Sequence, residues 1–434
     1  MPDASEPQPS HRALGPSSRS QVPDFQVMTI LGRVAELRAA GADVVSLCAG
    51  EPGGGAPTAV NARAAEVHAS GRALNYTPTL GIAPLRQAIA AHYARWYGLD
   101  VDPARVAVTT GSSGAFMLGF LAAFNPGDRV AMARPGYAAY RNILAALGCQ
   151  VVELDAGPAV RFQPTPALLE QAEAVHGPLA GLILASPNNP TGTMATRREM
   201  AALAQWCSGR GVRLVSDEIY HGVTYGEDGG AEGGGTAGDG AAGGGGAGVV
   251  RGVCAGEYSA EALVISSFSK YWGMPGWRIG WMLMPEDLAP AIGGLSGSVS
   301  LCPPAAAQYA AVEAFTEQSY AECDAQVAGF ARARVLVLEH QDRLGWTDAA
   351  PADGAFYFWA KPGEAMLARY GTSTAYCEAL LERAHVALTP GTDFDTAHGE
   401  EYVRLSFAAG ERDVAEAIER IVAFQDGVHR SSPR

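Results

Sequence analysis

The stretch LVISSFSKYWGMPGWRIGWMLMP at residues 263–285 decides the fold. It contains two apolar runs, at 263–270 and 278–285, which are separated by a turn rich in glycine and proline. Neither run alternates between polar and apolar residues, and such continuous runs are typical of strands that are buried on both faces of a sheet. The stretch therefore predicts two strands of a buried sheet, with Lys270 at the end of the first.

Five more apolar runs precede this stretch, and most are bounded by Gly, Pro, Asn or Asp and separated by helical segments. They lie at 105–111, 129–135, 150–156, 181–187 and 212–218. Strands that alternate with helices form a mainly parallel sheet covered on both faces. The predicted fold class is therefore α/β, with a mainly parallel seven-stranded sheet between helices.

The rest of the chain predicts a second, smaller α+β domain. After about residue 305 the chain becomes helical, and strand signals follow at 355–360 and 402–408. We assign 306–434 to this small domain, together with an N-terminal segment at 25–55, and 56–305 to the large domain. Residues 1–24 are rich in Pro, Ser and charge, which predicts a disordered arm.

One segment of the large domain breaks the pattern of strands and helices. More than half of residues 226–248 are glycine, so the segment has little apolar surface to offset its ordering entropy. We interpret it as a flexible surface insertion. A tolerated loop expansion and an active-site lid are the two alternatives for its role.

Composition excludes several classes of protein. The formal net charge is −14, which disfavours binding to nucleic acid or to an anionic membrane. No uninterrupted apolar run is long enough to span a membrane, and the N-terminus lacks the apolar region of a secretory signal. The seven cysteines form no C-x-x-C pair, so we expect no metal site and a cytoplasmic protein with reduced thiols.

Lys270 is the first candidate for chemistry. A lysine at the edge of a buried sheet must be paired, neutral or covalently used, because burying an isolated charge is costly. Alone, it would more often be a side chain that reaches the surface. Arg278 follows eight residues later and suits bidentate binding of a phosphate, and Ser267 and Ser269 flank Lys270 with hydroxyl groups.

Three other motifs end predicted strands. In TTGSSGAF (109–116), a turn of small residues opens an apolar helix, where backbone N–H groups can bind a phosphate or simply begin the helix. SPNNPTGT (186–193) carries turn signals and, on its own, predicts only a turn. In SDEIYHGVTY (216–225), Asp217 ends an apolar strand where open α/β sheets bind ligands, although a surface or helix-capping acid is the alternative.

Together these motifs fit one cofactor, pyridoxal 5′-phosphate (PLP). PLP needs a lysine for a Schiff base, an acid for the pyridine nitrogen and donors for the phenolic oxygen. It also needs an anion cradle and a flat group over its ring. Each of these residue types ends a predicted strand of the same sheet.

At these residues the sequence resembles the fold-type I PLP-dependent aminotransferases of class I/II, the aspartate aminotransferase superfamily. The resemblance covers the chain from about Phe25 to Phe424. Its most specific pieces are SPNNPTG, SDEIY and SFSKYWGMPGWRIG, which occur in the family's order and spacing. It implies that 56–305 binds PLP and that the protein is a homodimer.

The resemblance also implies residue roles. Lys270 matches the lysine that forms the aldimine and moves the substrate proton, Asp217 the partner of the pyridine nitrogen, and Tyr220 a donor to the phenolic oxygen. Arg278, Ser267, Ser112 and Ser113 match the phosphate cradle, and Tyr137 matches the ring stacked on the cofactor. Tyr76 matches a tyrosine that reaches the partner subunit's site, and Asn189 matches a second donor to the phenolic oxygen. Arg404, with Gly50 and Asn189, matches the site of the substrate carboxylate. For Arg404, inside an apolar strand, a structural buried ion pair is the alternative.

The sequence departs from the family pattern in places. GEP is followed by Gly-Gly-Gly-Ala-Pro (53–57) where Asp-Phe is common, which predicts a wider substrate entrance. Tyr271 and Trp272 follow the lysine where a small residue is common, and we expect them to add bulk near the cofactor. These differences concern the choice of substrate and leave the prediction of the cofactor unchanged.

The leading hypothesis for function is transamination between an amino acid and a 2-oxo acid. Residues 291–304 contain no Arg or Lys to bind a second carboxylate, so we expect a neutral or bulky amino acid as one substrate. The alternative reaction on the same fold is β- or γ-elimination, replacement or cyclisation of a sulfur- or sulfonium-bearing amino acid. A non-catalytic PLP-binding regulator is disfavoured, because only about 24 residues precede the domain and the chain is acidic.

Overall fold

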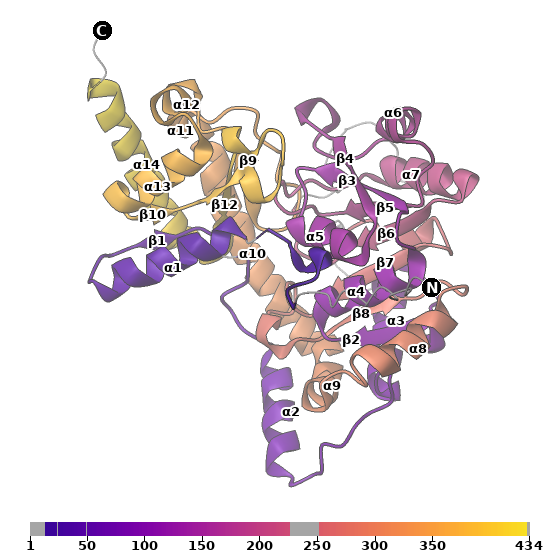
Figure 1. The fold of residues 1–434 in the computed structure, drawn as a ribbon. Coiled ribbons are helices and arrows are strands. Elements are labelled where there is room, and N and C mark those ends of the chain that lie inside the picture. The colour runs from indigo at the N-terminus through magenta and orange to yellow at the C-terminus, as the bar shows by residue number, and fades with distance from the viewer. Residues whose placement is uncertain (1–13, 24, 49, 226–250, 432–434) are drawn as a thin grey trace, which may run out of the picture.

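The computed structural model describes residues 14–23, 25–48, 50–225 and 251–431 (Figure 1). The predicted Gly-rich insertion at 226–248 and residues 1–13 of the predicted arm lie outside the described residues. Within the rest of the arm, Ser18–Ser20 form a single 3₁₀ turn that contacts α5 (Ala138–Leu147). The assignment of 1–24 to a disordered arm stays a prediction.

The large sheet has the seven predicted strands. They are β2 (Val106–Thr109), β3 (Arg129–Arg134), β4 (Gln150–Asp155), β5 (Gly181–Ala185), β6 (Arg213–Asp217), β7 (Leu263–Ser267) and β8 (Gly280–Leu283). Their order across the sheet is β2-β8-β7-β6-β5-β3-β4. Only β8 is antiparallel to its neighbours, β2 and β7, while all other pairs are parallel. The predicted fold class is confirmed.

Helices cover both faces of this sheet because successive strand residues point to opposite sides. In β7, Val264 belongs to one apolar cluster, whereas Leu263 and Ile265 belong to another. The first cluster includes residues of α3 (Ala83–Tyr97), α6 (Pro166–His176) and α7 (Arg197–Arg210). The second includes residues of α4 (Gly111–Ala123), α5 and α8 (Ala289–Val299).

A second, smaller region contains an antiparallel sheet in the order β11-β12-β9, formed by β9 (Tyr357–Ala360), β11 (Thr389–Pro390) and β12 (Val403–Ser406). Around it lie α1 (Gln26–Ala39), α12 (Glu364–Tyr370), α13 (Ser373–Ala384) and α14 (Glu411–Ser431), and α10 (Glu317–Glu339) runs between the two regions (Figure 1). β1 (Val45–Ser46) pairs in parallel with β10 (Val386–Ala387). The start of the chain is therefore joined to its C-terminal part, as the assignment of 25–55 to the small domain expects, although the exact domain bounds stay a prediction.

The remaining helices lie at the edges of these two regions. α2 (Thr58–Ala69) packs against α9 (Ala305–Ala311), and both project from one end of the molecule (Figure 1). α11 (Gln341–Leu344) follows α10 and contacts α14. Residues at the carboxyl ends of the parallel strands and residues of the small sheet line one cavity, which is the candidate site.

Candidate active site

A cavity of about 590 Å³ lies between the carboxyl ends of β6 and β7 and the small sheet. Ten of the twelve residues predicted for the site line it: Gly50, Ser112, Ser113, Tyr137, Asn189, Asp217, Tyr220, Lys270, Arg278 and Arg404. Parallel strands end at one edge of a sheet, so side chains that follow different strands come together there. The sequence motifs therefore meet in one place.

Lys270 lies at the centre of this cavity. Its Nζ donates a hydrogen bond of 2.5 Å to the backbone oxygen of Gly50. Burial lowers the pKa of Lys270 to about 8, and the positive charge of Arg404 acts in the same direction, while Glu51 and Asp217 oppose it. A substantial fraction of Lys270 is therefore the neutral, nucleophilic amine near pH 8.

Asp217 is the buried acid of the cavity. The hydroxyl of Tyr140 donates to its Oδ2, and the backbone N–H of Ile219 donates to Oδ1 at 3.1 Å. Burial raises the pKa of Asp217 to about 6, although these two donors and Lys270 lower it. A buried carboxylate that faces a cavity is suited to a cationic ligand atom, such as a protonated ring nitrogen.

The N-terminus of α4 forms a candidate anion site. No side chain caps this helix, and its first turn has no acidic residue, so the first backbone N–H groups are available to a ligand. The guanidinium of Arg278 lies beside this turn, so close that a Cβ at Gly111 would come within 2.4 Å of Arg278 Nη2. Gly111 also has φ of +71°, so glycine is needed here both for conformation and for space.

Arg404 lies on β12 and is suited to bind a carboxylate. Its Nη1 donates to Asn189 Oδ1 at 2.9 Å, and its Nη2 donates to the backbone oxygen of Cys48 at 2.8 Å. Its Nε is buried and has no hydrogen-bond partner among the described residues. Arg404 forms no ion pair with any described residue, so the structural alternative, a buried ion pair, finds no support here.

Tyr357 is a residue of the site that sequence reasoning missed. Its hydroxyl lies 2.7 Å from the hydroxyl of Tyr220, and its ring lies 4.5 Å from Arg404 Cζ. A Cβ at Gly50 would come within 2.9 Å of the same hydroxyl. All four residues of β9 are buried, so the alternation of polar and apolar residues that marks a pocket-facing position does not exist here.

Two further groups were missed. Tyr140 lies in the first turn of α5, three residues after Tyr137, which precedes this helix, and the second tyrosine of YAAY is a signal that could have identified it. The apolar wall of the cavity is formed by Phe25, Val27, Met28 and Leu31 at the start of α1. No local motif marks these four residues, since their place depends on how α1 packs on the rest of the chain.

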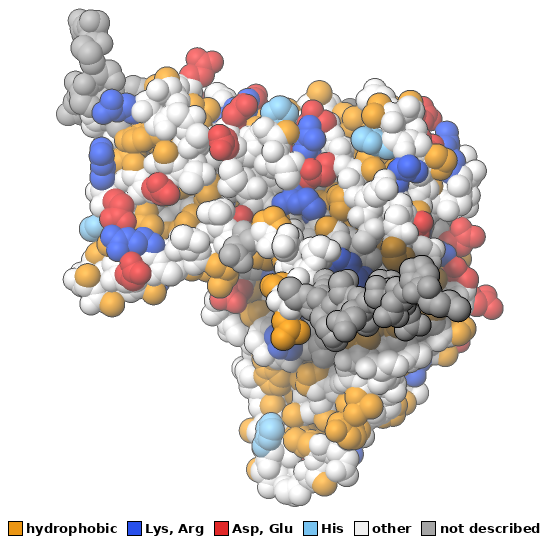
Figure 2. Space-filling view, in the orientation of Figure 1, with side chains coloured by type: hydrophobic (Ala, Val, Ile, Leu, Met, Phe, Trp, Pro, Cys, Tyr) orange, Lys and Arg blue, Asp and Glu red, His pale blue; other side chains and the backbone are white. Residues whose placement is uncertain are grey.

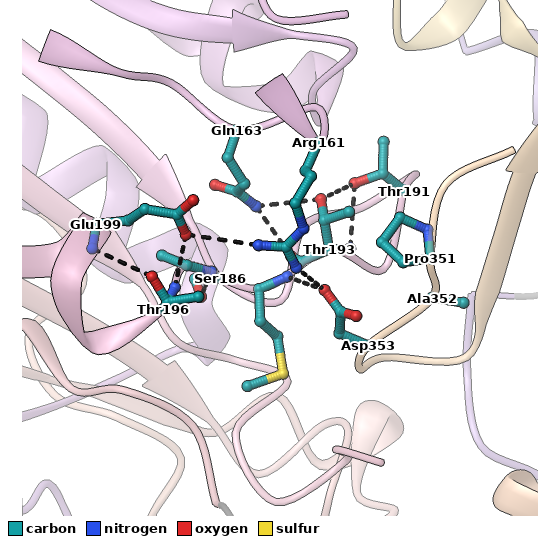
Figure 3. A network of polar contacts seen from close by, with 12 residues as sticks. Arg161, Gln163, Ser186, Thr191, Thr193, Thr196, Glu199, Pro351, Ala352 and Asp353 are labelled. Atoms are coloured by element: carbon teal, nitrogen blue, oxygen red, sulfur yellow. Dashed lines mark hydrogen bonds and ion pairs between the residues drawn. The ribbon is translucent and has the colours of Figure 1, made fainter. Parts of the chain in front are cut away.

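A polar network fixes the turn that carries Asn189 (Figure 3). Asp353 Oδ2 accepts hydrogen bonds from Arg161 Nη2 at 2.6 Å and from the backbone of Met194 at 3.1 Å. The Gln163 side chain donates to the backbone oxygen of Thr193 at 2.9 Å. Asp353 lies in the segment that leads to β9, so this network joins the turn at 186–193 to the strand that carries Tyr357.

Two predicted site residues lie outside the cavity lining. Ser267 is buried behind it, with its Oγ 2.8 Å from Oγ of Ser269, and Ser269 lines the cavity instead. Tyr76 is 81% exposed and does not line the protein's own cavity. Its role in a partner subunit stays a prediction.

The expectation that Tyr271 and Trp272 add bulk near the cofactor is wrong. The Tyr271 hydroxyl donates to Asp324 Oδ1 at 2.6 Å, and Trp272 Nε1 donates to the backbone oxygen of Ala314 at 3.0 Å. Neither residue lines the cavity. Both rings are buried in an aromatic cluster with Trp96, because the chain turns sharply after Lys270 at Gly273, whose φ is +62°.

No group of three or more His, Cys, Asp or Glu residues that could hold a metal ion occurs in the described part of the chain. In the same part, no helix has the length and apolar composition needed to cross a membrane.

Comparison with known proteins gives the family. The model of the family "Aminotransferase class I and II" matches residues 42–421. The chain is 46% identical to a valine–pyruvate aminotransferase of Mycobacterium tuberculosis, over 93% of this chain and 96% of that protein. It is 32% identical to an aspartate aminotransferase of Geobacillus stearothermophilus, over 92% of this chain and 95% of that protein.

Solved structures agree with the sequence comparison. A crystal structure of an aminotransferase from Mycobacterium tuberculosis superimposes with a TM-score of 0.85 and 44% identity, over 95% of this chain and 99% of that one. An aspartate aminotransferase from Thermus thermophilus with maleate gives a TM-score of 0.82 and 31% identity, over 94% and 99%.

The chain belongs to the class I and II aminotransferases. It is an enzyme that transfers an amino group between an amino acid and a 2-oxo acid, and its family implies PLP as the cofactor. The residues of the cavity fit that cofactor, because they provide a buried carboxylate, a lysine with a lowered pKa and an uncapped helix N-terminus beside Arg278.

Proposed function

We propose that the cavity binds PLP and that the enzyme transfers the amino group of neutral aliphatic amino acids. The observation that carries this proposal is the lining of the cavity. Its cations among the described residues are Lys270, Arg278 and Arg404, and each has a role in binding the cofactor or the substrate α-carboxylate. No further cation remains for a second carboxylate, and the wall from α1 is apolar.

The relatives support the same class of substrate. The relative that is 46% identical is named for valine and pyruvate, which are a neutral amino acid and a neutral-side-chain oxo acid. More distant relatives, near 30% identity, are named for aspartate or prephenate. The proposal therefore places this enzyme with the first relative rather than with the second group.

In the proposed site Lys270 and Asp217 would act on the cofactor and on the substrate proton. PLP, when bound, supplies an electron-withdrawing ring that stabilises negative charge on the substrate Cα. Lys270 would hold the cofactor covalently and, once released, would move the proton of the substrate Cα on its Nζ. Asp217 would hold a proton on the ring nitrogen, which a buried carboxylate favours electrostatically.

The remaining residues bind and orient. Arg278 and the first N–H groups of α4, at Ser112 and Ser113, would bind the phosphate. Tyr137 would stack on the ring. Asn189 Oδ1 accepts from Arg404, which leaves its Nδ2 to donate to the phenolic oxygen together with the hydroxyl of Tyr220. Arg404, beside Gly50, would hold the amino acid by its carboxylate.

We also propose that two copies form a homodimer in which Tyr76 reaches the partner's site. Large apolar side chains are exposed near Tyr76 and at the end of α8, namely Leu74, Val299 and Leu301. Figure 2 shows hydrophobic side chains gathered over α8 and α9 on this face. Such a surface supports association with another protein surface.

The cytoplasm is the proposed location. All seven cysteines are free, and six of them are buried, which suits a compartment that keeps thiols reduced.

The test of the substrate is an absorbance screen of the purified holoenzyme against valine, leucine, alanine, phenylalanine, glutamate and aspartate, with mass spectrometry of the products. We expect neutral amino acids to discharge the absorbance of the lysine-bound cofactor and to yield their 2-oxo acids. Turnover of aspartate far faster than of every neutral amino acid would overturn the proposal. Release of ammonia without any oxo-acid-dependent regeneration would indicate elimination instead.

A further inference from the structure

The N-terminus of α1 is capped by a side chain from the far end of the chain. The residue before this helix, Phe25, has no side chain that can accept a hydrogen bond. Instead, Asp393 Oδ1 accepts from the backbone N–H of Gln26 at 2.8 Å, and its Oδ2 accepts from that of Val27 at 3.0 Å. Asp393 is only 6% exposed, so both oxygens are committed to two helix donors in a water-poor place.

The turn that carries Asp393 also contacts two other walls of the active site. The ring of the next residue, Phe394, lies 4.7 Å from Arg404 Cζ. The backbone oxygen of Phe394 accepts from Gly136 at 2.9 Å, directly before Tyr137. The turn at 391–394 therefore fixes the start of α1 relative to both the carboxylate-binding arginine and the ring expected over the cofactor.

The first turns of α1 present an apolar face to the cavity. Val27, Met28 and Leu31 line it, and the helical spacing of 27 and 31 places these two side chains on the same face. Met28 is 64% exposed and has a flexible thioether side chain, so its atoms are open to contact with a ligand. No polar side chain of α1 lines the cavity at these positions.

We propose that Asp393 is a positioning residue for substrate selectivity. By fixing the start of α1, it holds Val27, Met28 and Leu31 where they contact the side chain of a branched aliphatic amino acid whose carboxylate is bound by Arg404. This inference rests on the proposed function, because it specifies the side-chain pocket of the same site. It concerns selectivity, and it assigns Asp393 no contact with the reacting atoms.

The size of the effect follows from the apolar surface involved. The side chain of valine has two more carbon groups than that of alanine. Burial of one such apolar group strengthens binding by a factor of about four. Displacement of the α1 wall can therefore lower the preference for valine over alanine by up to about 15-fold. We expect roughly a fivefold loss, because a helix without its cap still spends part of its time in place.

The experiment compares kcat/KM for valine and for alanine, with one 2-oxo acid as acceptor, in four holoenzymes. Asp393→Ala should lower the valine-to-alanine ratio about fivefold. Asp393→Asn should give a smaller loss than Asp393→Ala, since its amide keeps one acceptor oxygen for α1 where the carboxylate offers two. Asp395→Ala is the matched control: Asp395 lies in the same segment and is 5% exposed, but it accepts from Ala397 and His398 rather than from α1.

A second measurement does not need turnover. Hydrogen exchange of the amides at 26–31 should become faster in Asp393→Ala than in the parent and should be unaffected in Asp395→Ala. The inference is overturned if Asp393→Ala leaves the ratio unchanged, or if both alanine variants lower the two kcat/KM values to the same extent. Preference of the parent enzyme for aspartate would instead refute the proposed function and leave the exchange result standing.

Discussion

Replacing Lys270 with methionine is expected to stabilise the cofactor-free protein at neutral pH, even though it removes the residue proposed to hold the cofactor. Lys270 lies in a cavity where burial and the charge of Arg404 disfavour its ammonium form. The unfolded chain has no such environment, so its lysine keeps an ordinary pKa. Folding of the cofactor-free protein must therefore place a positive charge where it is unfavourable.

The magnitude follows from the pKa values. A pKa of about 8 in the folded protein, compared with the ordinary 10.5, corresponds to roughly 3 kcal/mol of unfavourable free energy. Lys270 Nζ also donates to the backbone oxygen of Gly50, and loss of that bond costs about 1 to 2 kcal/mol. The net gain expected for Lys270→Met at pH 7 is therefore about 1 to 2 kcal/mol.

The gain in stability from Lys270→Met should decrease as the pH rises. Below pH 8 Lys270 is protonated in both states, so the cost is fully present. Between pH 8 and 10.5 the folded protein loses its proton first, and the cost falls as the pH rises. Near pH 10.5 the advantage of the methionine variant should have disappeared.

The assay is urea unfolding of the cofactor-free parent and variant at several pH values from 7 to about 10.5, in phosphate-free buffer. The difference between the two free energies of unfolding reports on Lys270 and on its electrostatic effect on Asp217, while titrating groups that do not interact with Lys270 cancel. Lys361→Met is the matched control, since Lys361 is paired with Asp348 and Glu401 and its pKa is raised, so its loss should destabilise the protein. A Lys270→Met variant that is less stable than the parent at pH 7, or a difference that does not change with pH, would refute the reasoning.

Three further predictions concern the hydrogen bonds of the site. Tyr140→Phe removes the donor to Asp217 Oδ2, so the pKa of Asp217 should rise. Affinity for PLP, measured by fluorescence titration of the cofactor-free protein, should then fall about tenfold. Unchanged affinity would count against the proposed role of Asp217. Tyr357→Phe keeps the ring beside Arg404 but removes the hydroxyl paired with Tyr220, and steady-state kinetics should show about a fivefold loss in kcat/KM. Arg404→Lys should lower kcat/KM for every amino acid on the order of 100-fold, because an ammonium cannot bind a carboxylate through two parallel hydrogen bonds; an effect on only one substrate would contradict this.

Much of the fold could be predicted because its strands are continuous apolar runs bounded by turn residues. The run ending at Lys270 became β7, and the run starting at Arg278 became β8. The gathering of Lys270, Asp217 and Arg278 in one cavity could also be predicted, because all three lie at ends of strands of one sheet and together fit one cofactor, although each alone has a structural explanation. These patterns can be recognised from short stretches of sequence.

The features that could not be predicted depend on contacts between distant parts of the chain. Tyr271 and Trp272 follow Lys270 directly, yet the turn at Gly273 and the hydrogen bonds of Tyr271 to Asp324 and of Trp272 to Ala314 direct their side chains into the core. Tyr357 lies in a strand that is buried throughout, so periodicity gives no hint of its direction. The cap of α1 joins Gln26 to Asp393, and no residue near Gln26 in the sequence predicts this contact.

That last contact also sets an order of events during synthesis. A ribosome adds about 5 to 20 residues per second, so Asp393 emerges on the order of tens of seconds after Gln26. The pairing of β1 with β10 has the same requirement, because Val45 must wait for Val386. The large sheet is complete by Leu283, well before either contact can form. The beginning of the chain is therefore among the last parts to reach its final place, and with it the wall that faces the substrate.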